Sequence, residues 1–397
     1  MATLFNDNIV IVGFLLSLPG LAFYLSKHYK WARVISAPGL CYLFGIMLSN
    51  LHITPPESPV YDIISTYTVY LALPMILLSV NIKSWVRIAK TSLISFGCAC
   101  FFIFIISIIT GLFFAVKVDG THGWKVVGML VGTYSGGSMN LAAVGKGLNT
   151  PGDLFVAVNA ADIVLYSIFL PMQLLLIPFL SRWGFKDFNV IKYEESNIDS
   201  SSDLLHKKIK EEGYWHKKSW NLYDFVYIFS ISAFIMAISF LISHLFNFGI
   251  WTGTVNILLL TTFGLIAANF DKVKSLVGNE EISMYLLHIF FVAIGATAFM
   301  PTILKQSPVL IIWIAIAIYF SAFLHYLVAG KILKIDHQTI QVTAQAAVGG
   351  PSTALALAIS ANWPSLTITA VIAGLIGYGV GNYLGFAAAF IVYSILF

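Results

Sequence analysis

Charged residues are scarce in this chain of 397 residues, where Asp, Glu, Lys and Arg make up only 10%. A soluble domain carries about 25% charged residues. Hydrophobic residues make up 58% of the chain, and its mean hydropathy is +0.86. This balance excludes an ordinary soluble domain and predicts an all-α polytopic protein embedded in a lipid membrane. No transit segment precedes the first apolar run, so we expect a bacterial inner membrane.

Cysteine is also rare, and familiar catalytic motifs are missing. Cys41, Cys98 and Cys100 lie in apolar surroundings and support neither a disulfide framework nor a zinc ligand set. The chain has no Gly-x-x-x-x-Gly-Lys-Ser/Thr, no His-Glu-x-x-His and no Gly-x-Ser-x-Gly. We therefore expect no enzyme, no ATP-driven pump on this chain, no cofactor, no metal site and no nucleic-acid partner.

Apolar runs of helical length fall into two series. A membrane core about 30 Å thick takes about 20 residues of helix. The runs lie near 8–26, 35–52, 62–82, 92–116, 125–148 and 152–181, and then near 223–246, 250–269, 281–300, 308–329, 338–360 and 364–396. The polar, charged stretch between them predicts three parts: a first membrane repeat over 1–181, a charged cytoplasmic linker over 182–222 and a second repeat over 223–397.

Basic loops set the expected orientation of these runs. Lysine and arginine favour the cytoplasmic side, which places Lys27–Arg33, Lys83–Lys90, Lys272–Lys274 and Lys331–Lys334 inside. The fifth run then points inward and the eleventh outward, as inverted repeats require. Twelve simple spans would leave the linker outside, although its lysines favour the inside. The sequence therefore predicts eleven or twelve transmembrane segments.

Two glycine motifs interrupt apolar runs 213 positions apart. Gly136-Gly137-Ser138-Met139-Asn140 precedes Pro151, and Gly349-Gly350-Pro351-Ser352-Thr353 precedes Pro364 at the same interval. Paired Gly/Pro interruptions of this kind point to the binding site of a secondary transporter. The alternative is that these small residues merely let helices pack closely.

A helix broken at each motif would expose the N-terminus of a second half-helix. The unpaired N–H groups and positive dipole end at such a terminus attract anions. The predicted substrate-binding residues are therefore Ser135, Gly136, Gly137, Ser138, Asn140, Gly349, Gly350, Pro351, Ser352 and Thr353.

One acid lies deep inside an apolar run. Asp162 is costly there unless it is paired or hydrated, and Asn159 shares its helix face. We expect the two to bind the coupling ion; the alternative is a structural acid that caps a neighbouring break. Leu375 occupies the matching position of the second repeat. Lys146, placed near the cytoplasmic end of its run, is expected to snorkel toward water; the alternative is that it faces the substrate path.

The stretch from Val131 to Val144, VGTYSGGSMNLAAV, resembles the glycine-rich signature of the membrane proteins called domain of unknown function 819. Pro59–Asp62, Phe291–Ala296 and Val348–Ala354 agree with the same family, and the resemblance spans nearly the whole chain. That family resembles the cation/proton antiporter and anion transporter superfamily, which includes bile-acid/sodium and sodium/glutamate symporters.

The resemblance implies two inverted repeats, a core domain with two crossing broken helices, a scaffold domain, elevator-type movement, homodimers and coupling to Na⁺ or H⁺. This chain departs from many antiporters in one respect, because Asn159 and Asp162 stand in place of two adjacent aspartates. That difference favours solute symport over cation exchange.

Together these features predict an ion-coupled symporter for a small anionic organic solute, such as an amino acid, a carboxylate or a small peptide. Two alternatives stay open. One is a cation/proton antiporter that uses Asp162. The other is a membrane sensor or scaffold that transports nothing and docks partners through 182–222.

Overall fold

The computed structural model describes residues 4–55, 58–80, 90–187, 220–246, 248–298 and 300–396. These ranges contain helices and no strand, and eight helices are long and apolar enough to cross a membrane. The predicted all-α polytopic class is confirmed. Most of the predicted linker, 188–219, lies outside the described residues.

All twelve predicted apolar runs are helical. The first half contains α1 (Asn8–His28), α2 (Lys30–Ile35), α3 (Ala37–Asn50), α4 (Pro59–Leu77), α5 (Lys90–Val118), α6 (Gly123–Thr133), α7 (Ser138–Gly147) and α8 (Gly152–Arg182). The second contains α11 (Leu222–Leu245), η2 (Gly249–Trp251), α12 (Thr252–Ala267), α13 (Asp271–Lys274), α14 (Asn279–Ala296), α15 (Met300–Ala315), η3 (Ile316–Phe320), α16 (Ser321–Tyr326), η4 (Leu327–Ile332), α17 (His337–Ser360), η5 (Pro364–Leu366) and α18 (Thr367–Leu396).

Side-chain caps define where several of these helices begin. Asp7 accepts a hydrogen bond from the backbone N–H of Ile9 at the start of α1. Asn221 and Asp224 form a capping box at the start of α11. Each cap satisfies N–H groups that have no partner inside the helix, so these boundaries follow from local sequence.

The first broken segment turns back on itself. Gly137 has φ 93° and ψ −176° between α6 and α7. A straight helix from Lys125 to Asn149 would be about 36 Å long, yet the Lys125 Nζ donates to the Asn149 carbonyl at 2.7 Å. We call α6 and α7 the first hairpin; both of its ends lie at one face of the molecule and Gly137 lies at its tip.

The second broken segment folds back in the same way. Gly350, with φ 74° and ψ −170°, divides α17 into two helices. The rings of His337 and Trp363, near its two ends, have centroids 6.3 Å apart, whereas a straight helix would separate them by about 39 Å. We call the two parts of α17 the second hairpin, with Gly350 at its tip.

This folding back lowers the number of crossings below the eleven or twelve expected. Of the eight long apolar helices, α17 returns to the face it started from, which leaves seven. Counting the shorter α3, α12 and α14 as crossings gives ten within the described ranges, five on each side of the linker. An odd number in each half keeps the halves inverted. The prediction of two broken helices that each traverse the membrane is therefore corrected to two re-entrant hairpins.

The revised topology places both described ends of the linker and the basic loops Lys27–Arg33, Lys272–Lys274 and Lys331–Lys334 at one face, the cytoplasmic face under the positive-inside rule. Contacts agree with this arrangement. The N–H of His337 donates to the Lys186 carbonyl at 3.0 Å, which joins the end of α8 to the loop before α17. At the opposite face, the N–H of Leu4 donates to the His52 carbonyl at 3.0 Å. The cytoplasmic position of the linker itself stays a prediction.

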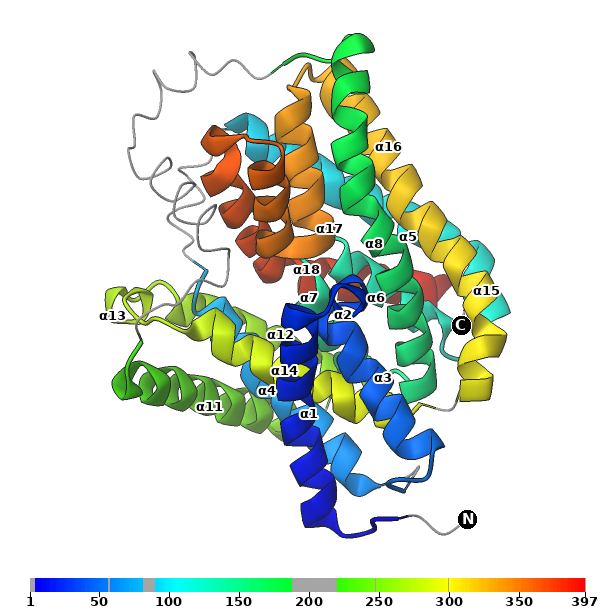
Figure 1. Cartoon of the computed structure of the whole chain (residues 1–397), viewed down its shortest axis with the longest axis vertical. Helices are drawn as coiled ribbons and strands as arrows, with labels where there is room; N and C mark the ends of the chain where they lie inside the picture. Colours follow the sequence, from blue (N-terminus) through cyan, green and yellow to red (C-terminus); the bar gives the residue numbers. More distant parts are fainter. Residues whose placement is uncertain are drawn as a thin grey trace.

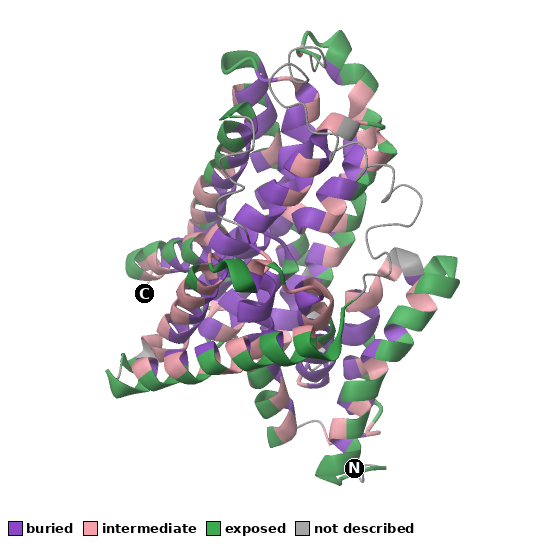
Figure 2. Cartoon of the chain, turned by 90° about the vertical axis from the view of Figure 1, so that its left-hand side faces the viewer, coloured by how far each residue is buried: buried purple, intermediate pink, exposed green. Residues whose placement is uncertain are grey.

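The helices form two bundles that each combine both halves of the chain (Figure 1). In the scaffold bundle, α14 packs along α3 and α4, and α11 and α12 pack on α4. In the hairpin bundle, α17 and α18 pack together, α18 and α5 pack on α6, and α15 packs on α8. Figure 2 shows the most buried residues in the interior and exposed residues along the outer helices and rims.

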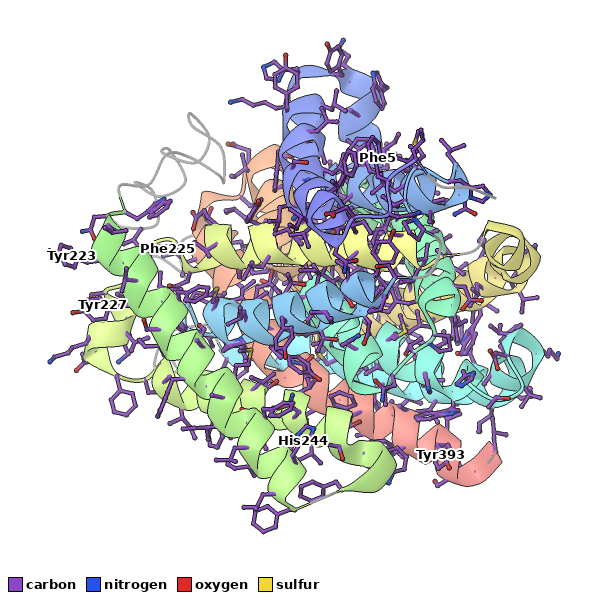
Figure 3. The ribbon with its side chains drawn as sticks, turned by 90° about the horizontal axis from the view of Figure 1, so that it is seen from below. Phe5, Tyr223, Phe225, Tyr227, His244 and Tyr393 are labelled. Atoms are coloured by element: carbon purple, nitrogen blue, oxygen red, sulfur yellow. The ribbon has the colours of Figure 1, made fainter. Side chains whose placement is uncertain are left out.

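The helix α11 lies at the periphery of the scaffold bundle (Figure 3). Tyr223 and Tyr227 are exposed near its start, and Phe246 and Phe248 are exposed just beyond its end. Aromatic side chains gather at both interfaces of membrane proteins. This pattern is typical of a helix whose outer face contacts lipid.

Candidate functional site

The tips of the two hairpins touch inside the protein. A β-carbon added at Gly137 would lie 3.5 Å from the carbonyl carbon of Gly349, and one at Gly350 would lie 3.5 Å from the Gly136 carbonyl oxygen. Both glycines adopt a backbone region that other residues rarely occupy. The backbones of the two breaks are therefore in direct contact, although the sequence places them 213 positions apart.

A row of glycines on α18 lies against this junction. Added β-carbons at Gly374, Gly377 and Gly381 would meet Pro351, the Ser135 backbone and the Asn140 side chain respectively. The Asn140 Nδ2 donates to the Gly377 carbonyl at 2.9 Å. Small residues let helix backbones approach closely in membranes, so α18 holds both tips without inserting side chains between them.

Asp162 lies in α8 beside the two tips. The residue is 6% exposed, and the Tyr134 hydroxyl, just before the first tip, donates to its Oδ1 at 2.6 Å. One turn further along α8, Tyr166 contacts Gly349 and accepts a hydrogen bond from Gln345 Nε2 at 3.3 Å. Among the described residues, no lysine, arginine or histidine lies within ion-pair distance of Asp162.

This environment constrains the chemistry of Asp162. A buried carboxylate without a counter-charge is costly, and a single hydrogen bond from Tyr134 offsets only part of that cost. A bound cation or a proton would neutralise it. Asn159 is also buried, one helical turn before Asp162, where its amide oxygen is suited to a Na⁺ ligand set.

The predicted substrate-binding residues have different roles in the structure. The Ser135 hydroxyl donates to the Val131 carbonyl of its own helix at 2.6 Å. The Thr353 hydroxyl donates to the Gly350 carbonyl at 3.3 Å. The side chain of Asn140 holds α18, although its Oδ1 has no partner among the described residues. Ser138 is exposed, and Ser352 and Thr353 are both half-buried, so the Ser138 hydroxyl is the most accessible of these.

Polar side chains tie the second hairpin to neighbouring helices. Gln345 accepts a hydrogen bond from Gln173 Nε2 at 2.8 Å, and Gln341 Nε2 donates to the Gln173 carbonyl at 2.6 Å. Ser95 Oγ lies 3.0 Å from His325 Nε2 and 2.7 Å from Thr343 Oγ1. Within the described ranges, no group of three His, Cys, Asp or Glu side chains lies close enough to hold a metal ion.

Sequence reasoning missed the tyrosines and the glycine row of α18. Tyr134 is adjacent to the first motif and Tyr166 follows Asp162 by four residues, so helical spacing could have identified both. Gly374, Gly377, Gly381 and Gly385 recur every three or four residues, which is one helix face. This row could have indicated a close contact, but not what it contacts.

Family membership agrees with the motifs at this site. The family model described as "Protein of unknown function (DUF819)" matches residues 13–395. The chain belongs to the DUF819 family. A relative from Bacillus subtilis (strain 168), the "Uncharacterized membrane protein YjcL", is 29% identical over 394 residues, which cover 96% of each chain. The predicted resemblance to this family is confirmed, and an integral membrane protein is supported. The link to bile-acid symporters stays a prediction.

Proposed function

We propose that this DUF819 protein is an ion-coupled secondary transporter for a small, anionic organic solute, such as an amino acid, a carboxylate or a small peptide. The observation that supports the proposal most strongly is the contact between two oppositely oriented hairpin tips beside the buried Asp162. Irregular backbone at membrane depth is tolerated where it is buried in protein or lines a cavity, and transporters place their sites at such breaks.

In this proposal, solute and ion bind to different groups. No side chain caps the N-terminus of α7 at Gly137, so the N–H groups of its first turn can face an anion together with Ser138, Ser352 and Thr353. Asp162 and Asn159 bind the coupling ion, Na⁺ or H⁺. Because Tyr134 joins the first tip to Asp162, ion binding would change the position of the tip that contacts solute.

The two bundles suggest how the protein moves. The hairpin bundle contains the tips and Asp162, whereas the scaffold bundle contains α11, whose exposed aromatic residues suit a lipid or subunit contact. We propose that the hairpin bundle moves against a fixed scaffold, as in elevator transporters. A homodimer joined through the scaffold, in a bacterial inner membrane, is the assembly that this movement would require.

Reconstitution in proteoliposomes tests this proposal. Purified protein is first screened by thermal unfolding against organic anions in Na⁺ and in K⁺, because a ligand stabilises the folded state by mass action. Uptake of the stabilising solute is then measured with and without an inward Na⁺ or H⁺ gradient. Uptake that is unaffected by either gradient would contradict ion coupling.

The antiporter alternative gives a different result in the same vesicles. A pH-sensitive dye would report proton flux when Na⁺ or K⁺ is added without organic solute. Strong exchange would favour the antiporter that uses Asp162. If no flux of either kind is found and deletion of 188–219 abolishes a signalling response, the sensor reading is favoured.

A further inference from the structure

A cavity of about 200 Å³ lies at the junction of the two bundles, away from the hairpin tips. It is lined by α4 and α14 of the scaffold bundle and by α7, the following loop and the start of α8 of the hairpin bundle. These elements meet at the face opposite the basic loops, which is the outer face under the positive-inside rule. An occupant would therefore contact both bundles from outside.

Lys146 supplies the positive charge in this cavity. Its Nζ donates to the Asp62 carboxylate at 2.5 Å and to Ser65 Oγ at 3.4 Å. Lys146 was expected near the cytoplasmic end, whereas the first hairpin returns its chain to the face opposite the basic loops, where Asp62 pairs with it. The lysine side chain is only 15% exposed.

The two partners of this ion pair differ strongly in exposure. The Asp62 side chain is 79% exposed, whereas that of Lys146 is 15% exposed. Asp62 can turn into water and remain hydrated at little cost, since exposed ion pairs contribute little stability. Lys146 would then keep a poorly hydrated charge, which another carboxylate could neutralise with charge-assisted hydrogen bonds.

The rest of the cavity suits the body of a small organic acid. Phe155 and Phe290 provide apolar surface. The Thr150 Oγ1 is shielded from solvent and has no hydrogen-bond partner among the described residues, although buried polar atoms are usually paired. The surrounding loop is fixed, because Lys125 Nζ holds the Asn149 carbonyl at 2.7 Å.

We propose that this cavity binds small monocarboxylates, with Lys146 on the carboxylate, Thr150 as an additional polar contact and Phe155 and Phe290 on the apolar body. Asp62 is the internal carboxylate that forms an ion pair with Lys146 while the cavity is empty. The role of this cavity as a solute site rests on the proposed transport function. Binding of the monocarboxylate itself requires neither an ion gradient nor movement of the bundles.

Calorimetric titration of the purified full chain with butyrate and with butyramide tests the proposal. The two probes have nearly the same shape and differ in charge, so the wild-type protein should bind butyrate and not butyramide. Lys146→Gln should weaken butyrate binding at least about tenfold, because a charged hydrogen bond is lost. Asp62→Asn should tighten it by about two- to fivefold, because the competing carboxylate is removed.

Lys274→Gln is the matched control. Lys274 forms a comparable pair with Asp271 at 2.8 Å, outside the cavity, so its loss should leave butyrate affinity unchanged. Thr150→Val provides a second test if Lys146→Gln does not fold, and it should weaken binding about fivefold. Thermal unfolding of every variant verifies that it is folded.

Equal affinity for butyrate and butyramide would overturn the proposal. So would a folded Lys146→Gln that binds butyrate as the wild type does, or a wild-type protein that does not bind butyrate. These failures are distinct from failure of the transport proposal, which would appear as missing gradient-driven uptake in vesicles. Either proposal can therefore fail while the other holds.

Discussion

The two hairpins have the same backbone conformation at their tips, but the residues around the two tips differ. Gly137 and Gly350 have nearly the same dihedral angles and occupy equivalent positions of the two repeats. Beside the first tip, Tyr134 bonds the acid and Asn140 bonds α18. At the equivalent positions the second repeat has Ala347 and Thr353, and Thr353 bonds the Gly350 carbonyl and the Tyr166 side chain of α8. The break at a glycine is thus present in both copies, whereas the polar side chains beside it differ between them.

The largest expected effect comes from removing the acid beside the first tip. Asp162→Asn should reduce gradient-driven uptake by about 5- to 150-fold, the usual range of a coupling free energy between two sites. Tyr134→Phe should cause a smaller loss, because the acid remains. Uptake in proteoliposomes measures both, with Asp271→Asn in the scaffold bundle as the control. Unchanged uptake by a folded Asp162→Asn protein would show that the acid in the first half does not couple ion binding to transport.

Alanine at either tip should destabilise the protein. The dihedral angles of Gly137 and Gly350 cost other residues about 1–3 kcal/mol, so Gly137→Ala and Gly350→Ala should lower the free energy of unfolding by similar amounts. Gly97→Ala is the control, because an added β-carbon there meets nothing within 4 Å. Thermal unfolding in detergent gives the comparison. A cost at one tip alone would show that the two breaks are not equivalent.

The polar residues at equivalent positions should differ in importance. Asn140→Ala removes the bond to the Gly377 carbonyl and should destabilise the protein by about 1–3 kcal/mol, the cost of a buried unpaired group. Thr353→Ala should cost less than about 1 kcal/mol, because Thr353 is less buried than Asn140 and the partners that it leaves can be hydrated. Equal losses of unfolding free energy would mean that the Asn140 contact with α18 contributes no additional stability.

The base of the second hairpin should show a small dependence on acid. Hydrogen bonds from Ser181 and from His337, at 2.9 Å each, lower the pKa of Asp187 below its usual range. A lowered folded pKa stabilises above the unfolded value of about 3.9, and this stability is lost as the pH falls through the folded pKa. The protection factors of amides at 331–338, taken relative to the intrinsic exchange rate at each pH, should therefore be steady from neutral pH to about pH 5 and fall below about pH 4.

Asp187→Asn should abolish this acid dependence while the exchange rates at neutral pH change little, since Asp187 is largely exposed. If the acid dependence at 331–338 persisted in Asp187→Asn, Asp187 would not be its cause.

The sequence predicted the helices, the two breaks and the buried acid, because each leaves a local signature: apolar length, Gly/Pro interruption or an ionisable residue at membrane depth. It did not predict that the breaks reverse the chain. A double glycine shows that the backbone leaves the helix, but the angle at which it re-enters depends on packing, here of α6 against α7 and of α18 against both tips.

The environment of Lys146 could not be predicted from the sequence either, because it also depends on the reversal of the chain. Its distance from Asp62 along the chain gives no hint of contact, and its position at the outer face follows only from the reversal at Gly137. Tyr134 could have been identified from the sequence as a candidate site residue, since it lies two residues before the first motif. Its hydrogen bond to Asp162 could not have been predicted, because this bond joins two helices that are separate in sequence.

Repeating one plan leaves the ends of the two hairpins chemically unequal. Position 359 of the second hairpin matches position 146 of the first, and it is Ile359. The ion pair of Lys146 with Asp62 therefore lies at the end of one hairpin, and an uncharged side chain lies at the matching position of the other. Under the proposed transport function, an anionic solute would meet different chemistry at the two ends.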